Sequence, residues 1–543
     1  MTSQEFKAKA TALIDDLKGV CASYGLGNDG NEFKIITQVF LYKFLNDKFA
    51  HEVKCIEPAL AKAKSWEDTL RKKPKGEYEL LLMQLGADTA RLKPNHFLST
   101  LYGKQNDDNF AATLDATLLD IAKLNADIFS VKTNDGQKIV LFDAVTQYVA
   151  SQRDAFAKAI INKLIPFSFE RIFAEKFDFY ATLFEYLIKD YNKDGGGKYA
   201  EYYTPHAVAK IMAACLVPEK VKNVTCYDPA AGSGTLLMNL AHAIGEDRCT
   251  IYTQDVSQKS SSLLRLNLIL NNLVHSIPNV IQGNTILEPY HKEDNGTGLR
   301  KFDYIVSNPP FKLDFSDFRN QLDTKANQKR FFAGIPNVSP KSKDKMAIYL
   351  LFLQHIIHSL DKNGRAAVVV PTGFITAQSG IDKSIREHLV KNKMLGGVVS
   401  MPSNIFATTG TNVSILFIDA TNNEEVILID ASSLGEKIKE GKNQKTILRP
   451  DEEQRIIETF NAKKAVDDFS VTVSYDEIKA KNYSLSAGQY FEVKIEYSEI
   501  CEEEFQERIR NFSQEFERLL KLSGETDKLI KSTMPKLKYE EKK

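Results

Sequence analysis

The spacing of hydrophobic residues divides the chain into a helical first part and a mixed second part. Up to about residue 165, apolar side chains recur every three or four positions, as at Phe33, Ile36 and Phe40. This spacing places them on one face of a helix, and alternating runs of β-branched residues are scarce. We therefore predict an all-helical N-terminal domain over residues 1–165.

From about residue 225, short apolar runs with strand character alternate with helical segments. We expect strands at residues 225–227, 250–253, 279–281, 304–306, 366–370 and 397–400, with helices at 236–244, 261–271 and 346–360. This alternation is typical of βαβ units and implies a mainly parallel sheet covered by helices. Two further runs, 413–418 and 426–429, fit an antiparallel pair. We predict an α/β domain over residues 166–483.

The last segment, residues 484–543, is polar and helical in pattern. Its apolar positions step by four, three, four and three residues, which is the spacing of a short coiled-coil seam. These positions are Phe505, Ile509, Phe512, Phe516 and Leu519. We interpret this tail as a partner-docking helix, with packing on its own domain as the alternative.

Composition limits the classes of function. The 543 residues hold 71 Lys and Arg against 71 Asp and Glu, so the formal net charge is zero. A protein that grips DNA alone usually has a basic excess, so this chain would use a local patch, rely on a partner or not touch nucleic acid. The six cysteines are scattered without metal-ligand spacing, which predicts reduced thiols and no metal site. With no signal peptide and no apolar run of about 20 residues, we expect a cytoplasmic protein.

One short motif follows the strand at residues 304–306, namely Asn308-Pro309-Pro310-Phe311. Proline restricts φ and removes a backbone donor, and Pro310 excludes Pro309 from the α region. The motif should be a rigid loop at the carboxyl end of a strand, where open α/β sheets bind ligands. Taken alone, a simple Pro-Pro loop with a buried Phe explains it about equally well.

Three other strand ends carry residues suited to ligand binding. After the strand at 225–227 comes the turn Asp228-Pro229-Ala230-Ala231-Gly232-Ser233-Gly234-Thr235, whose small residues let a ligand approach the backbone at a helix N-terminus. Asp255 ends the second strand, where an acid commonly accepts hydrogen bonds from a ribose. Asn284 follows the third strand and could bond an adenine edge through its amide. The joint order of the four strand ends is more specific than any one of them.

With these motifs, the chain resembles S-adenosylmethionine-dependent amino-methyltransferases of the DNA N6-adenine class. The helical N-terminal domain and the segment Glu201-Tyr202-Tyr203-Thr204-Pro205-His206 narrow the resemblance to the modification subunit of type I restriction–modification systems. It covers nearly the whole chain and implies a Rossmann-like methyltransferase sheet. The family also implies S-adenosylmethionine as cofactor, double-stranded DNA as substrate, and a specificity subunit that reads the sequence. A restriction subunit completes the complex, with two modification subunits for each specificity subunit.

The resemblance also implies roles for the motif residues. Residues 201–206 would belong to the cofactor site, with Tyr203, Thr204 and Pro205 closing over the methionine end of the cofactor. Residues 228–235 would hold the methionine moiety, and Asp255 would bind the ribose. Many relatives have Glu at the position of Asp255 and Asp at that of Asn284. The first change keeps the role with a shorter acid, whereas the second makes the adenine contact less secure.

The predicted chemistry fits Asn308 and its neighbours. The exocyclic amine of adenine is a poor nucleophile because its lone pair is delocalised into the ring. The Asn308 side-chain oxygen and the Pro309 carbonyl could accept its two N–H groups, and Phe311 could stack on the base. The base must first be flipped out of the duplex.

Several alternatives remain open from the residues. A stand-alone DNA methyltransferase would need its own target-recognition domain. N5-glutamine methylation of a protein uses the same Asn-Pro-Pro logic, whereas N4-cytosine enzymes usually replace Asn308 by Ser or Thr. A non-catalytic scaffold on DNA is the fourth alternative. The basic segment 325–345 would be either a lid touching DNA phosphates or a solvated loop.

Overall fold

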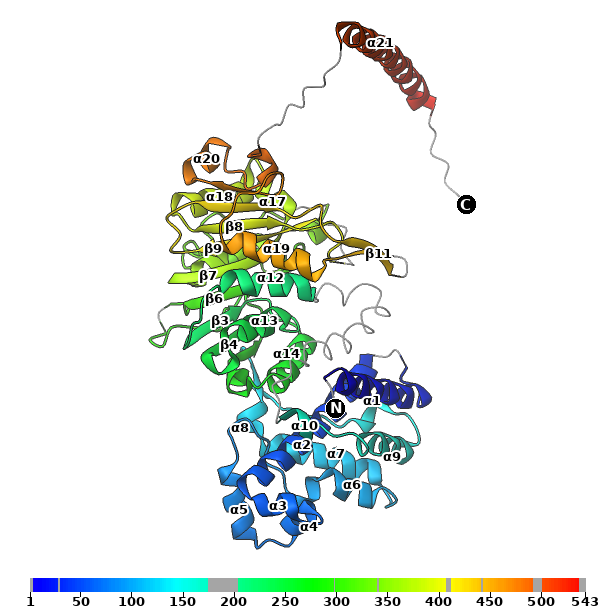
Figure 1. Ribbon diagram of the computed structural model, residues 1–543. Coiled ribbons are helices and arrows are strands. Elements are labelled where there is room, and N and C mark those ends of the chain that lie inside the picture. The colour runs from blue at the N-terminus through cyan, green and yellow to red at the C-terminus, as the bar shows by residue number, and fades with distance from the viewer. Residues whose placement is uncertain are drawn as a thin grey trace. The chain divides into compact units, whose positions relative to one another are not determined.

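The computed structural model describes residues 3–27, 30–173, 204–296, 298–338, 341–406, 412–440, 443–491 and 501–536. The chain divides into two compact units, Met1–Phe491 and Glu492–Lys543. The first unit contains the sheet, the helices around it and the N-terminal helices (Figure 1).

An 11-stranded sheet is the centre of the first unit, in the order β13-β10-β8-β9-β7-β6-β3-β4-β5-β1-β2. Neighbouring strands from β7 to β1 run parallel, whereas β9 is antiparallel to both β7 and β8. The strands are β1 (Val131–Thr133), β2 (Lys138–Ile139), β3 (Val224–Asp228), β4 (Cys249–Asp255), β5 (Val280–Gln282), β6 (Phe302–Ser307), β7 (Leu360–Pro371), β8 (Leu395–Ser400), β9 (Val413–Asp419), β10 (Val426–Asp430) and β13 (Ser470–Val473). A separate hairpin pairs β11 (Glu436–Glu440) with β12 (Asn443–Ile447). The predicted α/β fold with a mainly parallel sheet is confirmed.

Helices cover both faces of this sheet. In β7, Ala367 and Val369 belong to one hydrophobic core, whereas Ala366, Val368 and Val370 belong to the other. Strands buried on both faces read as continuous apolar runs, which is why this segment was recognisable in the sequence. The covering helices are α12 (His206–Leu216), α13 (Thr235–Ile244), α14 (Gln258–Leu270), α16 (Tyr349–Ser359), α17 (Thr372–Thr376), α18 (Gly380–Lys391), α19 (Pro450–Asn461) and α20 (Tyr475–Ala480).

The N-terminal part is a cluster of helices around α2 (Gly30–Ile56), whose residues are buried on most sides. Buried polar groups of α2 are paired: Lys43 Nζ lies 2.9 Å from Asp47 Oδ1, and Asp47 Oδ2 accepts the Phe169 amide at 2.8 Å. The other helices are α1 (Ser3–Ser23), α3 (Pro58–Lys62), α4 (Trp66–Arg71), α5 (Lys75–Gln84), α6 (Leu98–Lys104), α7 (Phe110–Leu124), α8 (Ala126–Phe129), α9 (Arg153–Leu164) and α10 (Glu170–Phe173).

This helical region also contributes a short hairpin, β1–β2, that the periodicity did not indicate. β1 pairs in parallel with β5, with Lys132 opposite Ile281 and Thr133 opposite Gln282. The buried Arg265 of α14 donates to the carbonyls of Ile139 and Val140 at 3.0 and 2.9 Å. The expectation of an all-helical first domain thus misses two strands, and the hairpin that precedes residue 165 is part of the large sheet.

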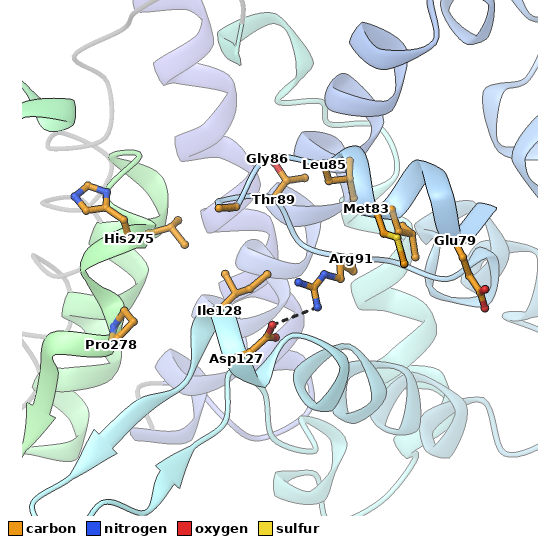
Figure 2. A pocket seen from close by; sticks show the side chains of 13 residues that line it. Glu79, Met83, Leu85, Gly86, Thr89, Arg91, Asp127, Ile128, His275 and Pro278 are labelled. Carbon is orange, nitrogen blue, oxygen red and sulfur yellow. Dashed lines mark ion pairs between the residues drawn. The ribbon is translucent and has the colours of Figure 1, made fainter. Parts of the chain in front are cut away.

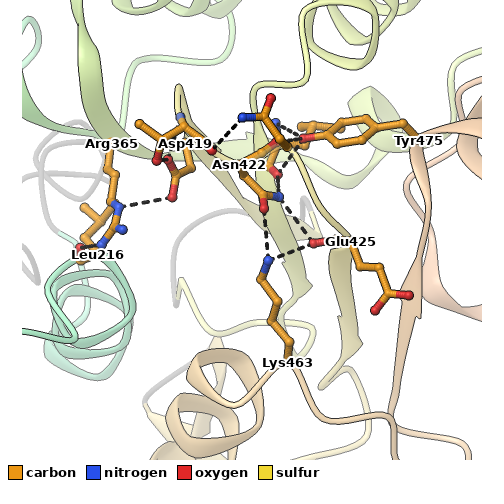
Figure 3. Close-up of polar contacts among 10 residues, drawn as sticks. Leu216, Arg365, Asp419, Asn422, Glu425, Lys463 and Tyr475 are labelled. Atoms are coloured by element: carbon orange, nitrogen blue, oxygen red, sulfur yellow. Dashed lines mark hydrogen bonds and ion pairs between the residues drawn. The ribbon is translucent and has the colours of Figure 1, made fainter.

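A polar network closes the turn that joins β9 to β10 (Figure 3). Lys463 Nζ donates to Asn422 Oδ1 at 2.9 Å and to the Glu425 carbonyl at 3.0 Å. The Asn422 amide donates to the Leu395 carbonyl, and the Tyr475 hydroxyl donates to the Asn422 carbonyl at 2.8 Å. These hydrogen bonds satisfy backbone carbonyl groups in and beside the turn at which the chain reverses direction between β9 and β10.

The second unit is described by itself. It consists of the long helix α21 (Glu502–Thr533) and a short turn after it. The predicted helical tail is confirmed, and the predicted seam residues are exposed, with Phe512 71% and Phe516 64% accessible. Docking of this helix on a partner stays a prediction. In the described part of the chain, no helix has the length and apolar character needed to cross a membrane.

We expect Arg265→Met to lower the free energy of unfolding of the chain by about 2–4 kcal/mol, because buried carbonyls of the β1–β2 region lose a charged donor. Urea unfolding measures the change. Lys391→Met serves as the control, since its pair with Glu387 is exposed and such pairs contribute about 0–1 kcal/mol. Equal losses in the two variants would contradict the anchoring role of Arg265.

Candidate functional site

Residues from the ends of β3, β4, β5 and β6 line one cavity of about 330 Å³. Because parallel strands end at the same edge of a sheet, residues far apart in sequence meet there. The predicted site residues that line it are Thr204, Asp228, Pro229, Ala230, Ala231, Gly232, Ser233, Thr235, Asp255, Asn284, Asn308 and Pro310. The structure thus brings all four predicted strand ends together.

The remaining predicted site residues either do not line the cavity or lie outside the residues that the structure describes. Gly234, Pro205, His206, Pro309 and Phe311 do not line the cavity. Glu201, Tyr202 and Tyr203 lie outside the described residues. α12 begins at His206, directly after Pro205.

The glycine turn between β3 and α13 depends on two residues with positive φ. Gly232 has a φ of 52° and Gly234 a φ of 84°, a region that residues with a Cβ atom rarely adopt. A Cβ on Gly234 would lie 2.2 Å from Leu264 Cδ1 of α14. The turn therefore requires glycine for its backbone conformation, and a Cβ at Gly234 would in addition displace the end of the Leu264 side chain.

Asp228 joins the glycine turn to the loop of residues 308–311, which is the candidate catalytic loop. Its Oδ1 accepts the Ala230 amide at 2.9 Å and the Ser307 hydroxyl at 2.9 Å. Because the side chain is buried, desolvation raises the pKa of its carboxyl to about 7. A positive ligand group in the cavity would favour the ionised form.

Asp255 binds the same turn from the neighbouring strand. Its Oδ2 accepts the Gly232 amide at 2.9 Å, and its Oδ1 accepts the Ser257 amide at 2.8 Å. Burial raises the pKa of this carboxyl, while the two amide bonds oppose the shift. A carboxylate oxygen has two lone pairs, so both oxygens keep capacity for ligand hydroxyl groups.

Asn284 uses its side-chain oxygen within its own loop. Its Oδ1 accepts the amides of Ile286 at 3.0 Å and Leu287 at 3.1 Å. This arrangement engages both lone pairs of the oxygen. Only the amide nitrogen can therefore serve a ligand, as a hydrogen-bond donor.

Asn308 is half-buried, and its Nδ2 donates to the Thr204 hydroxyl at 3.2 Å. Thr204 is itself buried, at 6% exposure. The bond links Thr204 to the loop of residues 308–311. It engages the nitrogen end of the Asn308 amide and leaves the oxygen as an acceptor for another group.

The other residues of the loop 308–311 differ in how much of each side chain is exposed. Pro309 is buried and Pro310 is exposed. Phe311 is half-buried, with its ring edge-on to Tyr349 at a centroid distance of 6.2 Å. Phe311 therefore lies beside the cavity rather than in its lining, with part of its surface accessible.

Sequence reasoning missed several apolar residues of the lining. They are Leu236, Val256, Leu313, Phe318, Ile348 and Phe352, together with Lys312. Val256 had a usable signal in the sequence, because it directly follows the acid at the strand end. The residues after 311 had none, since only the folded segment brings them back to the cavity.

The basic segment 325–345 contains two kinds of cation. Lys325, Lys329, Lys341 and Lys343 are exposed, in accord with either of the predicted roles. Arg330 is 3% exposed and therefore does not serve as a DNA-phosphate contact. Its guanidinium turns inward, toward the loop that contains Asn284.

A larger cavity, of about 770 Å³, lies among residues of α5, α8 and η5 (Val274–Asn279) (Figure 2). Arg91 and Asp127 form an ion pair at 3.3 Å in its wall. It contains neither a glycine turn nor a carboxyl end of a sheet strand, so we place the candidate site at the smaller cavity.

The pKa of Asp228 predicts a dependence of stability on pH. The pKa of the Asp228 carboxyl is about 7 in the folded chain and about 4 in the unfolded chain. Between about pH 4 and about pH 7 the folded state therefore binds more protons than the unfolded state. Stability from this group is thus lost as pH rises from about 4 to 7. Relative to Asp228→Asn, we expect the wild type to lose about 2 kcal/mol between pH 5 and 8 in urea unfolding. If the difference in free energy of unfolding between wild type and Asp228→Asn does not change with pH, the raised pKa of Asp228 is contradicted.

Comparisons with known proteins identify the family of the chain. The family model described as N-6 DNA Methylase matches residues 175–499. The type I restriction enzyme MpnII methylase subunit of Mycoplasma pneumoniae is 27% identical over 351 residues, which are 63% of this chain and 62% of the relative. The MjaIX methylase subunit of Methanocaldococcus jannaschii is 26% identical over 378 residues, 66% of this chain and 63% of the relative. The matches thus span less than two thirds of either relative.

A solved structure also resembles the chain. The type I restriction-modification methyltransferase subunit from Streptococcus thermophilus superposes with a TM-score of 0.67 at 22% identity, and the match covers 91% of this chain and 100% of that one. The two proteins therefore share a fold over most of the length of this chain. Since the family model covers more than half of the sequence, the chain belongs to the N-6 DNA methylase family.

Proposed function

We propose that the protein transfers a methyl group from S-adenosylmethionine to N6 of a flipped-out adenine in DNA. The observation that carries the proposal is the meeting of four motif-bearing strand ends at one cavity, with Asn308 bonded to Thr204 beside it. A glycine turn or a Pro-Pro loop alone would support only ligand binding in general.

The cavity fits the proposed cofactor in size and in its donor set. Its volume of about 330 Å³ lies within the range of about 300–1,000 Å³ for small-molecule sites. Two buried carboxyl groups, Asp228 and Asp255, suit a ligand with a positive methionine half and a ribose half. Their burial without an ion pair among the described residues leaves them ready for a cationic ligand.

We assign the cofactor's parts to the strand ends as follows. Residues 228–235 would hold the methionine moiety, with Thr204 at the end of the segment that closes over it, and Asp255 would accept from the ribose hydroxyls. Asn284 would act at the adenine through its amide nitrogen, because its oxygen serves two backbone amides. As a donor, it would pair with a ring nitrogen rather than with the exocyclic amine.

The catalytic loop would activate the target amine by orienting it. The Asn308 oxygen and the Pro309 carbonyl each accept one N–H, which favours a tetrahedral nitrogen with a directed lone pair. The prolines hold the two acceptors at a constant separation. When bound, S-adenosylmethionine supplies a methyl group on an already activated sulfonium. Positioning is then the main requirement, and effects of this kind can reach about 7–11 kcal/mol.

The target base would rest beside Phe311. N6 of a paired adenine is out of reach of a cavity in the protein, so the base must leave the duplex. Phe311 is half-exposed and braced edge-on by Tyr349, so its free surface offers a stacking platform next to Asn308. Stacking on an aromatic ring contributes about 1–3 kcal/mol for each base.

We further propose that the chain acts as the modification subunit of a type I complex. Two relatives are type I methylase subunits, and the zero net charge of this chain suits a protein whose partner reads the DNA. In this proposal a specificity subunit supplies sequence recognition, two copies of the chain flank it, and a restriction subunit joins the full complex. The helix α21, with its exposed apolar seam, is the proposed docking element.

Reconstitution tests the proposal. Purified protein is incubated with tritium-labelled S-adenosylmethionine and DNA, with and without the specificity subunit, and the product base is identified by mass spectrometry. We expect N6-methyladenine only when the specificity subunit is present. Methylation without it would indicate a stand-alone DNA enzyme, and labelling of glutamine in protein would indicate the N5-glutamine alternative. Cofactor binding without transfer to any substrate would favour the scaffold.

We expect Asn308→Ala to lower methyl transfer at least about 100-fold, because the amine loses an acceptor that positions it. Cofactor affinity, measured by calorimetric titration, should change less than threefold. Asn308→Asp keeps the acceptor oxygen and replaces the Thr204-facing donor, and it serves as the matched variant. Equal loss of transfer and of cofactor binding in Asn308→Ala would contradict the role of this side chain in the reaction.

Asp255→Ala should act first on the cofactor. Loss of a charged acceptor for two hydroxyl groups predicts a rise of about 10–100-fold in the dissociation constant of S-adenosylmethionine. The rate at saturating cofactor should fall much less, as measured by initial rates over a range of cofactor concentrations. An unchanged dissociation constant would show that the ribose lies elsewhere.

A further inference from the structure

Arg330 is a buried cation in a segment whose other basic residues face solvent. It lies between the catalytic loop and α16, and its side chain is 3% exposed. Among the described residues it has no ion-pair partner, so its charge is compensated by neutral acceptors. A guanidinium is rarely buried without a carboxylate, because removing a charge from water is costly.

Its donors are directed to one loop of the cofactor cavity. Nη2 donates to the Thr285 carbonyl and Nη1 to the Ile286 carbonyl, both at 2.7 Å. Thr285 lines the cavity and donates its hydroxyl to the Pro229 carbonyl at 2.7 Å. The guanidinium thus supports, from behind, the loop that carries Asn284 and connects it to the glycine turn.

A third bond orients the guanidinium. Arg330 Nε donates to His355 Nδ1 at 3.0 Å, so the proton of the neutral imidazole must be on Nε2. Nε2 lies 3.1 Å from the Tyr227 hydroxyl and donates to it. His355 is buried, and desolvation, with Arg330 beside it, lowers its pKa well below the usual range. A neutral ring in one tautomer therefore holds Arg330 in place.

The segment around Arg330 is packed rather than loose. Phe315, Leu322 and Phe331 form a small hydrophobic core with Ile348, Phe352 and Ile286 of the supported loop. Ile348 and Phe352 also line the cavity, as do Lys312 and Leu313 of the same segment. The segment after the catalytic loop is therefore a wall of the cofactor site, with Lys325, Lys329, Lys341 and Lys343 exposed to solvent.

We propose that Arg330 is a positioning residue for the nucleobase half of the cofactor, acting through the carbonyls of Thr285 and Ile286. This inference rests on the proposed binding of S-adenosylmethionine at the cavity. Without the two guanidinium donors, the buried carbonyls need other partners, and the loop leaves the position that presents Asn284 to the ligand. The effect falls on cofactor affinity, since neither Asn308 nor Pro309 contacts this loop by a described hydrogen bond.

The chain offers a matched control for a buried guanidinium. Arg386 of α18 is also fully buried, and it donates to the carbonyls of Tyr483, Phe374 and Ala377. None of these residues lines the cofactor cavity. Arg386→Lys therefore also removes a buried guanidinium that donates to backbone carbonyls, but it changes no residue at the cofactor cavity.

The experiment compares Arg330→Lys, Arg386→Lys and wild type in the full chain. We expect Arg330→Lys to raise the dissociation constants of S-adenosylmethionine and S-adenosylhomocysteine about 10–50-fold in calorimetric titration. The rate at saturating cofactor, in the presence of DNA and the specificity subunit, should stay within threefold. Arg386→Lys should lower the free energy of unfolding at least as much and leave both dissociation constants unchanged.

A second variant covers the case in which Arg330→Lys does not fold. His355→Gln keeps a donor near Tyr227 and removes the acceptor for Arg330 Nε, so it should raise the dissociation constants about threefold. Unchanged binding in the folded variants, or an equal rise in Arg386→Lys, overturns the role of Arg330. Absence of cofactor binding in the wild type would instead overturn the proposed function itself.

Discussion

The structure of the site depends on the Asp228 carboxyl group. One of its oxygens accepts hydrogen bonds from the Ala230 amide of the glycine turn and from the hydroxyl of Ser307, the last residue before the loop 308–311. Two strand ends that are about 80 residues apart in sequence are therefore held by one buried acceptor. Because the group is buried, desolvation raises its pKa to about 7, and the two hydrogen bonds that join the strands offset only part of this shift. A cationic ligand would favour the ionised form of the carboxyl that receives both bonds, so ligand binding and the alignment of the two loops would be linked.

The sequence was informative where local chemistry determines structure. Residues 228–235 were predicted to form a turn between a strand and a helix from their small residues, and the turn is present, with Gly234 at a positive φ. β7 was recognised because both of its faces are buried and its apolar run is continuous. In these cases the signal lies within one element, and neighbouring elements do not change it.

The sequence did not predict those features that depend on contacts between distant parts of the chain. The strand β1 is three residues long and shows no periodicity, and only its pairing with β5 makes it a strand. Arg330 stands among lysines in a polar segment, so its charge suggested an exposed role. Its burial follows from Thr285, Ile286 and His355, which come together only in the fold. A side chain's charge therefore did not predict its exposure, because the acceptors are backbone carbonyls.

The β1–β2 hairpin has a consequence for dissecting the protein. β1 covers the edge of β5, and Asn134, next to it, donates to the Glu288 carbonyl and accepts from Gln254 Nε2. A fragment that starts after residue 165 would expose the hydrogen-bonding groups of β5 along an open edge, which favours association between sheets. It would also remove a support beside the loop that carries Asn284. The smallest fragment with an intact sheet therefore begins before Val131.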